Sequence, residues 1–238
     1  FFGQFALQHR GQESAGICAA DGERIRCHTA MGLVGQAFQE DTLAGIPGHI
    51  GIGHNRYSTT GSSNLANAQP IVVQGPDIEL ALAHNGNVIN AADLRIELGE
   101  WGCDFSSTGD SEIIAPVIAN APATTWEERI AYAMRRLQGA YSLTMMTKDA
   151  LLGVRDPLGV RPLCIGKLNN GWVIASESCA LDHIGATYLR ELEPGEAVII
   201  TKDGMRSFVW PGVDGRRALC VFELIYFSRP DSVLDGKL

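Results

Sequence analysis

Residues 79–94 read ELALAHNGNVINAADL, with the polar triplet Asn85-Gly86-Asn87 between two more apolar stretches. An Asn-Gly pair between apolar runs is a strong hairpin signal, because both residues tolerate positive φ angles. The local pattern therefore predicts a turn at Asn85-Gly86. Whether the amides of this turn also hold a ligand depends on the chain around it.

Tight turns connect most of the strands expected on either side of this stretch. Two strands flank Asp21-Gly22, a strand from residue 48 runs into a loop rich in Ser, Thr and Gly, and a hairpin over 70–86 turns at 75–77. Further strands are expected at 140–147, 150–154, 162–168 and 171–178, followed by a strand pair over 196–210 that turns at 202–204.

Helical patterns occupy the start and the middle of the chain, at 1–9, 34–46, 91–98, 108–121 and 124–139. In the last of these, Trp126, Ile130 and Met134 share one face, and Thr125 can cap the first turn. Because the strands are joined by turns and the main helices sit together, we expect an antiparallel α+β fold with two sheets packed face to face and helices outside.

The composition is that of a globular protein that acts on small molecules. The 238 residues carry a net charge of −8 without a Lys/Arg block, which argues against nucleic acid as a partner. No apolar run approaches the ~18 residues of a membrane span. The six cysteines form no CxxC pair. We therefore expect reduced thiols, no zinc site and a cytoplasmic location.

Four polar clusters stand at the ends of apolar stretches: 9–12, 55–59, 84–87 and 109–112. Taken alone, Asp110 is best explained as a helix N-cap and Arg56 as a surface arginine. Together they indicate more, because an arginine can grip an α-carboxylate, an aspartate can hold an α-ammonium group, and an Asn amide with a Gly N–H can stabilise an oxyanion. That set fits acyl transfer on a free amino acid.

An obvious nucleophile is missing from these clusters. Cys103, Cys164 and Cys179 are candidates, but each stands in a context typical of a small buried residue.

Six motifs occur in a fixed order: LQHRGQESAGI, HNRYSTTG, AHNGN, STGDSE, RDPLGVRPL and ASESCALD. They resemble the N-terminal-nucleophile (class II) glutamine amidotransferases, and the resemblance covers essentially the whole chain. Within that class, QHRGQES and CVFELIYFSRPDSVLDG are similar to the amidophosphoribosyltransferases. The glucosamine-6-phosphate synthases, whose motif is closer to RGYDSAG and which lack YFSRPDS, are a more distant alternative, as is a non-catalytic glutamine-binding module.

The resemblance implies a four-layer αββα Ntn-hydrolase sandwich with two antiparallel sheets. It implies that Arg56 binds the carboxylate of glutamine and that Asp110 binds its amino group. Asn85 and Gly86 would form the oxyanion hole, Thr59 would line the same pocket, and Arg10 would support it.

The resemblance also implies partners outside this sequence. Residues 1–215 would be a glutaminase domain without its first strand, which carries the nucleophilic cysteine. Residues 216–238 would begin the connection to a phosphoribosyltransferase domain that uses Mg²⁺ and phosphoribosyl diphosphate. The product would be 5-phosphoribosylamine, in the first step of purine synthesis, and the enzyme would be a homo-oligomer.

Cys220 lies where some relatives place one ligand of a 4Fe–4S cluster. A buried strand cysteine is the alternative, because a cluster needs several thiolates and no partner at a suitable spacing is visible.

Overall fold

The computed structural model describes residues 1–57 and 64–237. Its strands are β1 (Ser14–Ala20), β2 (Ile25–Met31), β3 (Ile50–Arg56), β4 (Ile71–Gln74), β5 (Glu79–Val88), β6 (Gly139–Met146), β7 (Leu151–Arg155), β8 (Cys164–Leu168), β9 (Gly171–Ala175), β10 (Thr187–Glu191), β11 (Glu196–Thr201) and β12 (Gly204–Val209). Its longer helices are α4 (Ala91–Glu100), α5 (Ser111–Ala119) and α6 (Trp126–Arg136). Its shorter helical segments are α1 (Phe2–Ala6), η1 (Gln8–Arg10), α2 (Val34–Ala37), α3 (Glu40–Ala44), η2 (Leu65–Asn67), α7 (Ser178–His183) and the π-helical η3 (Glu223–Phe227).

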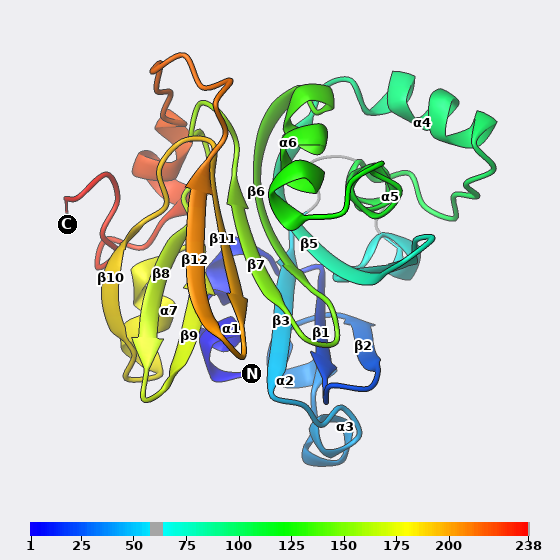
Figure 1. Cartoon of the computed structure of the whole chain (residues 1–238). Helices are drawn as coiled ribbons and strands as arrows, with labels where there is room; N and C mark the ends of the chain where they lie inside the picture. Colours follow the sequence, from blue (N-terminus) through cyan, green and yellow to red (C-terminus); the bar gives the residue numbers. More distant parts are fainter. Residues whose placement is uncertain (58–63, 238) are drawn as a thin grey trace.

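The strands form one six-stranded sheet, in the order β12-β11-β7-β6-β5-β4, and two three-stranded sheets, β2-β1-β3 and β10-β8-β9 (Figure 1). Neighbouring strands pair antiparallel throughout these sheets. The expectation of antiparallel sheets is therefore confirmed, but the layer expected to be a second sheet is divided in two, with β3 and β9 at the facing edges.

Alternation along the central strands explains the layers, because successive side chains of a strand point to opposite faces. Leu80 and Leu82 of β5 pack into the core beneath α4, α5 and α6, whereas Ala81 and Ala83 face β1 and β3. Val198 of β11 faces β8 and β9 in the same way. Both small sheets thus cover one face of the large sheet, and α1, α2 and α7 pack on their outer side. This is the four-layer αββα sandwich.

The central prediction about local structure was wrong. Asn85-Gly86 is not a turn, because β5 continues through it to Val88 and pairs with β6. Gly86 has φ +154°, and a Cβ atom there would lie 2.0 Å from the carbonyl oxygen of Ala140. Glycine at this position therefore lets β5 pass close to β6 rather than reverse direction.

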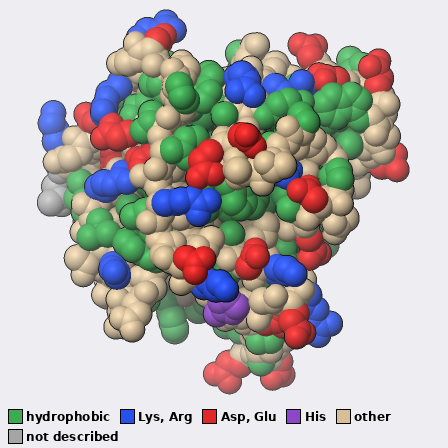
Figure 2. Space-filling view, viewed as in Figure 1, with side chains coloured by type: hydrophobic (Ala, Val, Ile, Leu, Met, Phe, Trp, Pro, Cys, Tyr) green, Lys and Arg blue, Asp and Glu red, His purple; other side chains and the backbone are tan. Residues whose placement is uncertain are grey.

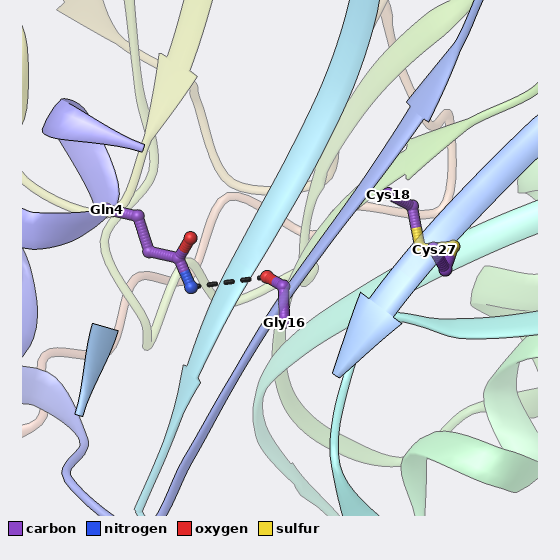
Figure 3. The surroundings of a disulfide bond; sticks show 4 residues. All are labelled: Gln4, Gly16, Cys18 and Cys27. Atoms are coloured by element: carbon purple, nitrogen blue, oxygen red, sulfur yellow. Dashed lines mark hydrogen bonds between the residues drawn. A yellow bond between two sulfur atoms is a disulfide. The ribbon is translucent and has the colours of Figure 1, made fainter. Parts of the chain in front are cut away.

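The expectation of reduced thiols was also wrong for one pair. Cys18 and Cys27 are register partners on β1 and β2, their Cα atoms lie 4.0 Å apart, and the structure joins them in a disulfide (Figure 3). The other four cysteines are free. Figure 3 also shows Gln4 of α1, whose side-chain amide donates a hydrogen bond to the carbonyl oxygen of Gly16, at 3.2 Å.

Several short elements differ from the sequence expectations. The helix expected at 34–46 is divided into α2 and α3, and the strand expected at 171–178 ends at Ala175, where α7 follows. Strand β10 and the π-helical turn η3 were not anticipated. Within the described part of the chain, no helix has both the length and the apolar character needed to cross a membrane. On the face shown in Figure 2, basic and acidic side chains are interspersed.

Candidate active site

The structure describes six of the residues predicted to form a site, and all six line one pocket of about 290 Å³. Five of them are the predicted substrate-binding and oxyanion residues, and the sixth is Cys220. The five are Arg10, Arg56, Asn85, Gly86 and Asp110. Thr59 lies outside the described residues. The pocket is formed where the C-terminal ends of β3 and β5 meet the start of α5 and the segment 220–227, with Arg10, Arg161 and residues from 67–71 also in its lining, so distant parts of the sequence converge on it.

Asn85 presents a side-chain amide with no partner among the described residues. Its Nδ2 atom is shielded from solvent and makes no hydrogen bond to residues 1–57 or 64–237. A buried donor without an acceptor normally costs free energy, about 1–3 kcal/mol, so each such group calls for an explanation. Because Asn85 and Gly86 both line the pocket, an oxygen atom of a bound molecule can accept this hydrogen bond.

Asp110 stands at the N-cap position of α5, but its side chain does not cap the helix. Its Oδ2 atom instead accepts a hydrogen bond from the backbone N–H of Val88, at 2.9 Å, and its Oδ1 atom lies 3.6 Å from Nδ1 of His84. Burial acts to raise the pKa of Asp110, but His84 and the Val88 N–H outweigh it, so the pKa is lowered from its ordinary value. The carboxylate therefore stays ionised at neutral pH.

A hydrogen-bonded bridge ties β5 to the start of α5 next to Asp110. The side chain of Gln69 accepts from the backbone N–H of His84, at 2.7 Å, and donates to Oγ of Ser111, at 2.8 Å. Ser111 Oγ lies 3.2 Å from Nδ1 of His84. These bonds hold the strand that carries Asn85 and the helix that follows Asp110 in one position.

Arg56 ends β3 and is buried, with its guanidinium group ion-paired to Glu13. Arg56 is therefore a buried cation that lines the pocket, and not the surface arginine that the local sequence alone suggests.

Residues 220–233 form a segment that we call the front wall, because Cys220, Phe222, Tyr226 and Phe227 line the pocket. Glu223 is fully buried there and accepts hydrogen bonds from both terminal nitrogens of Arg10, at 3.0 and 3.1 Å, and from Arg161, at 2.8 Å. The guanidinium carbon of Arg10 also lies 4.4 Å from the ring centroid of Phe227. Arg10 therefore anchors this wall and is itself held by it.

A second buried carboxylate completes the anchor. Glu177, at the start of α7, pairs with Arg10 and with His9, and its Oε2 atom accepts from the backbone N–H of Arg229, at 2.9 Å, and from Oγ of Ser232, at 2.7 Å. Residues on α7, η1 and the front wall are therefore joined through two carboxylates that share one arginine.

Cys220 borders the same pocket, and its Sγ atom lies 4.0 Å from a guanidinium nitrogen of Arg161. Among the described residues, the one compact group of potential metal ligands is His9, Glu177 and Cys179, and Cys220 is not part of it. The described residues thus place no further potential ligand next to Cys220 in a compact group.

A groove of about 360 Å³ runs between the facing edges of β3 and β9. It is lined by Ile52, Gly53, Val173 and Ile174, among others. Four residues line both this groove and the pocket, namely Arg10, His54, Asn55 and Asn85. The two cavities therefore meet at Asn85.

Sequence reasoning missed five residues that line the pocket or hold its lining residues in place: Glu13, His54, Gln69, Glu177 and Glu223. Of these, His54 directly precedes a polar cluster that the sequence singled out, and Glu13 directly follows another. Gln69 lies in a segment without a distinguishing local pattern. Glu177 and Glu223 lie within two of the quoted motifs, ASESCALD and CVFELIYFSRPDSVLDG, but nothing local marks them, because their partners in the pocket lie far away in the sequence, up to 213 positions for Glu223 and Arg10.

Comparison with known proteins agrees with the resemblance to glutamine amidotransferases that the motifs indicate. Residues 54–183, more than half of the chain, match the model of a glutamine amidotransferase domain. The amidophosphoribosyltransferases of Synechocystis sp. and Synechococcus elongatus are 52% and 49% identical to the chain, covering 100% of it and 49% of each relative.

The structure of a glutamine phosphoribosylpyrophosphate amidotransferase from B. subtilis, complexed with ADP and GMP, matches with a TM-score of 0.91 and 43% identity, over 99% of this chain and 51% of that one. The chain thus spans about half the length of these relatives. By the domain match, which includes Arg56, Asn85, Gly86 and Asp110, the chain belongs to the glutamine amidotransferase domain family.

Proposed function

We propose that this chain is the glutamine-hydrolysing part of an amidophosphoribosyltransferase, and that the pocket binds glutamine. The observation that carries this proposal is the unpartnered, buried amide of Asn85 in a pocket that also contains a buried arginine and an ionised aspartate. A free amino acid has one carboxylate, one ammonium group and, in glutamine, a side-chain carbonyl, so each pocket group has a matching partner.

In this proposal Arg56 attracts the α-carboxylate of glutamine and Asp110 accepts hydrogen bonds from its α-ammonium group. The lowered pKa of Asp110 supports the second role, because the carboxylate is then ionised at neutral pH, where the ammonium group is protonated. The two charges together orient the substrate, which leaves its side-chain amide toward Asn85.

The side-chain N–H of Asn85 and the backbone N–H of Gly86 then stabilise the negative charge that develops on the amide oxygen. Donors that are placed before the reaction contribute most to such steps, because nothing has to reorganise as the charge forms. In the described part of the chain Asn85 Nδ2 has no competing partner, which supports this role.

The nucleophile is proposed to be a cysteine on a strand from outside these 238 residues. The groove between β3 and β9 supports this, because edge strands offer unpaired N–H and C=O groups to a further strand. A strand in that groove would unite the two small sheets and would pass beside Asn85. The 238 residues alone are then expected to release no ammonia from glutamine. Release that disappears when an internal cysteine is replaced would contradict this.

The acceptor is proposed to be phosphoribosyl diphosphate, which would yield 5-phosphoribosylamine. The names of the relatives support this acceptor over the sugar phosphate of glucosamine-6-phosphate synthase. Magnesium binding, homo-oligomer formation and a cytoplasmic location remain predictions about the full-length protein. Residues 216–238 are proposed to lead into its phosphoribosyltransferase domain.

Arg56→Ala and Asp110→Ala in the full-length protein test the substrate roles. Each variant should raise the KM for glutamine, whereas the reaction with free ammonia should persist, because that reaction needs the other domain alone. Arg24→Ala is the matched control, since Arg24 is exposed and distant from the pocket. Parallel loss of both reactions would show that Arg56 and Asp110 serve the fold rather than the substrate.

A cluster at Cys220 remains a prediction that requires ligands from outside this chain. Iron and acid-labile sulfide analysis of the full-length protein tests it, and the absence of both would refute it.

A further inference from the structure

His54 contacts the strand that carries Asn85 from the opposite layer. It lies on β3, in a three-stranded sheet, and its Nε2 atom is 3.0 Å from the carbonyl oxygen of His84 on β5, in the six-stranded sheet. That carbonyl belongs to the peptide unit whose nitrogen is that of Asn85. The bond therefore joins the two layers at the residue before the proposed oxyanion donor.

The chemistry of this contact defines the state of the ring. A carbonyl oxygen can only accept a hydrogen bond, so Nε2 carries a proton and donates. The other ring nitrogen, Nδ1, is shielded from solvent and has no partner among the described residues. Burial, and then the neighbouring His84, Arg56 and Arg10, lower the pKa of His54 to about 4. The imidazole is therefore neutral around pH 7, with its single N–H committed to the backbone.

Asn85 needs such a contact because its own side chain is not held. An amide without a hydrogen-bond partner takes its direction from the backbone that carries it. The residue after Asn85 is Gly86, which has no side chain to pack. The residue before it is His84, whose carbonyl group belongs to the peptide bond that joins it to Asn85. Pairing with β6 holds the edge of β5, but the groove and the pocket meet on the face where Asn85 points. His54 supplies the contact on that face.

We propose that His54 is a positioning residue for glutamine hydrolysis: its neutral ring clamps the His84–Asn85 peptide and thereby aims the Asn85 amide and the Gly86 N–H into the pocket. This inference rests on the proposed function, because it assigns His54 a role in the same oxyanion site. His54 does not exchange a proton with the substrate in this account.

The experiment compares His54→Ala, His54→Gln and Asn85→Ala in the full-length protein, with glutamine and with free ammonia as nitrogen donors. His54→Ala should lower the glutamine-dependent kcat by about 10- to 100-fold, the range expected when a catalytic group is misplaced by up to about 1 Å, and should leave KM little changed. His54→Gln retains an N–H donor of comparable reach and should recover most of that loss. The ammonia-dependent rate should be unchanged in each variant.

The pH profile separates positioning from proton transfer. His54→Gln should keep the wild-type profile of glutamine-dependent kcat, because the ring does not titrate near neutral pH. His49→Gln is the matched control, since His49 is exposed just before β3 and lines neither cavity. It should behave as the wild type.

Three outcomes would overturn the clamp: an unchanged kcat in His54→Ala, an equal loss in His54→Gln, or loss of the ammonia-dependent rate as well. The Asn85→Ala variant keeps the two proposals separate. If Asn85→Ala has normal glutaminase activity, the proposed oxyanion site itself fails. If Asn85→Ala is impaired and His54→Ala is not, the clamp alone fails.

Discussion

The two walls of the pocket are held in place by different forces. On the β5 side, Asn85 and Gly86 lie within a strand, paired with Ser142 and Tyr141 of β6, and the supporting side-chain contacts come from Gln69 and from one carboxylate, that of Asp110. The front wall, by contrast, has one π-helical turn and is anchored by two buried carboxylates that share Arg10. Several of its residues are apolar and exposed, such as Ile225 at 68%, which does not line the pocket.

The two walls therefore differ in what their stability depends on. A strand paired along its length holds its residues at fixed positions, which suits the donors of the proposed oxyanion site, because such donors contribute most when they are placed before charge develops. A buried ion cluster has a high desolvation cost and is stable only when every member is present. The front wall therefore depends on its charges as a set, whereas the β5 wall does not.

Removing one charge from the front wall should have the largest effect. Glu223→Gln leaves Arg10 and Arg161 short of a carboxylate and should lower the free energy of unfolding by about 3–5 kcal/mol, as for other broken buried pairs. Urea denaturation measures this. The matched control is Glu127→Gln, whose pair with Arg206 is exposed and should contribute less than about 1 kcal/mol. An equal decrease in the free energy of unfolding in the two variants would contradict the special dependence of the front wall on its buried charges.

Removing a donor from the β5 wall should act on catalysis instead. Asn85→Ala in the full-length protein should lower the glutamine-dependent kcat by ~10²–10³, or roughly 2.7–4 kcal/mol, with KM and the ammonia-dependent rate little changed. Asn85→Asp should also be poor, since a carboxylate repels an oxyanion. Asn170→Ala, at an exposed position between β8 and β9, is the control. Near-normal turnover in Asn85→Ala would place the oxyanion hole elsewhere.

Acid should weaken the front wall selectively. Burial acts to raise the pKa of Glu177, but His9, Arg10 and the backbone N–H of Arg229 lower it to about 2, from an ordinary 4.5. Since the folded pKa is the lower one, this carboxylate stabilises the fold above about pH 4.5, and the contribution of roughly 3 kcal/mol is lost as the pH falls toward 2.

Thermal unfolding across that pH window tests the assignment. Glu177→Gln should lose stability less steeply than the wild type as the pH falls. Curves of equal slope would mean that Glu177 is not the group responsible.

The smallest change in stability is expected when a side chain is added at Gly86, where β5 lies close to β6. Gly86→Ala and Gly204→Ala both place a side chain at a positive φ, but nothing lies within 4 Å of the new Cβ at Gly204, whereas at Gly86 the Ala140 oxygen would be 2.0 Å away. Gly86→Ala should therefore destabilise by an additional amount of about 1–3 kcal/mol, the usual range for overpacking. Equal losses in denaturation would show that φ alone requires glycine at Gly86.

Local sequence was enough to find the polar ends of the strands. Arg56 follows an apolar run, Asn85 interrupts one and Asp110 precedes one, and their side-chain chemistry predicts an amino acid as ligand. The antiparallel α+β class also followed from turn spacing and from the helical period around Trp126. These features depend on residues within a few positions of one another, which is the range over which propensity and periodicity act.

Tertiary packing decided what those residues became. Asn-Gly has the local signature of a turn, yet the approach of β6 to Gly86 and the pairing along β5 make it part of a strand. Asp110 has the signature of an N-cap, yet its carboxylate bonds to Val88. His54 and Glu223 meet their partners across 30 and 213 positions. Such contacts form only once the layers are packed, because their free energy comes from burial and desolvation that no short segment can provide by itself.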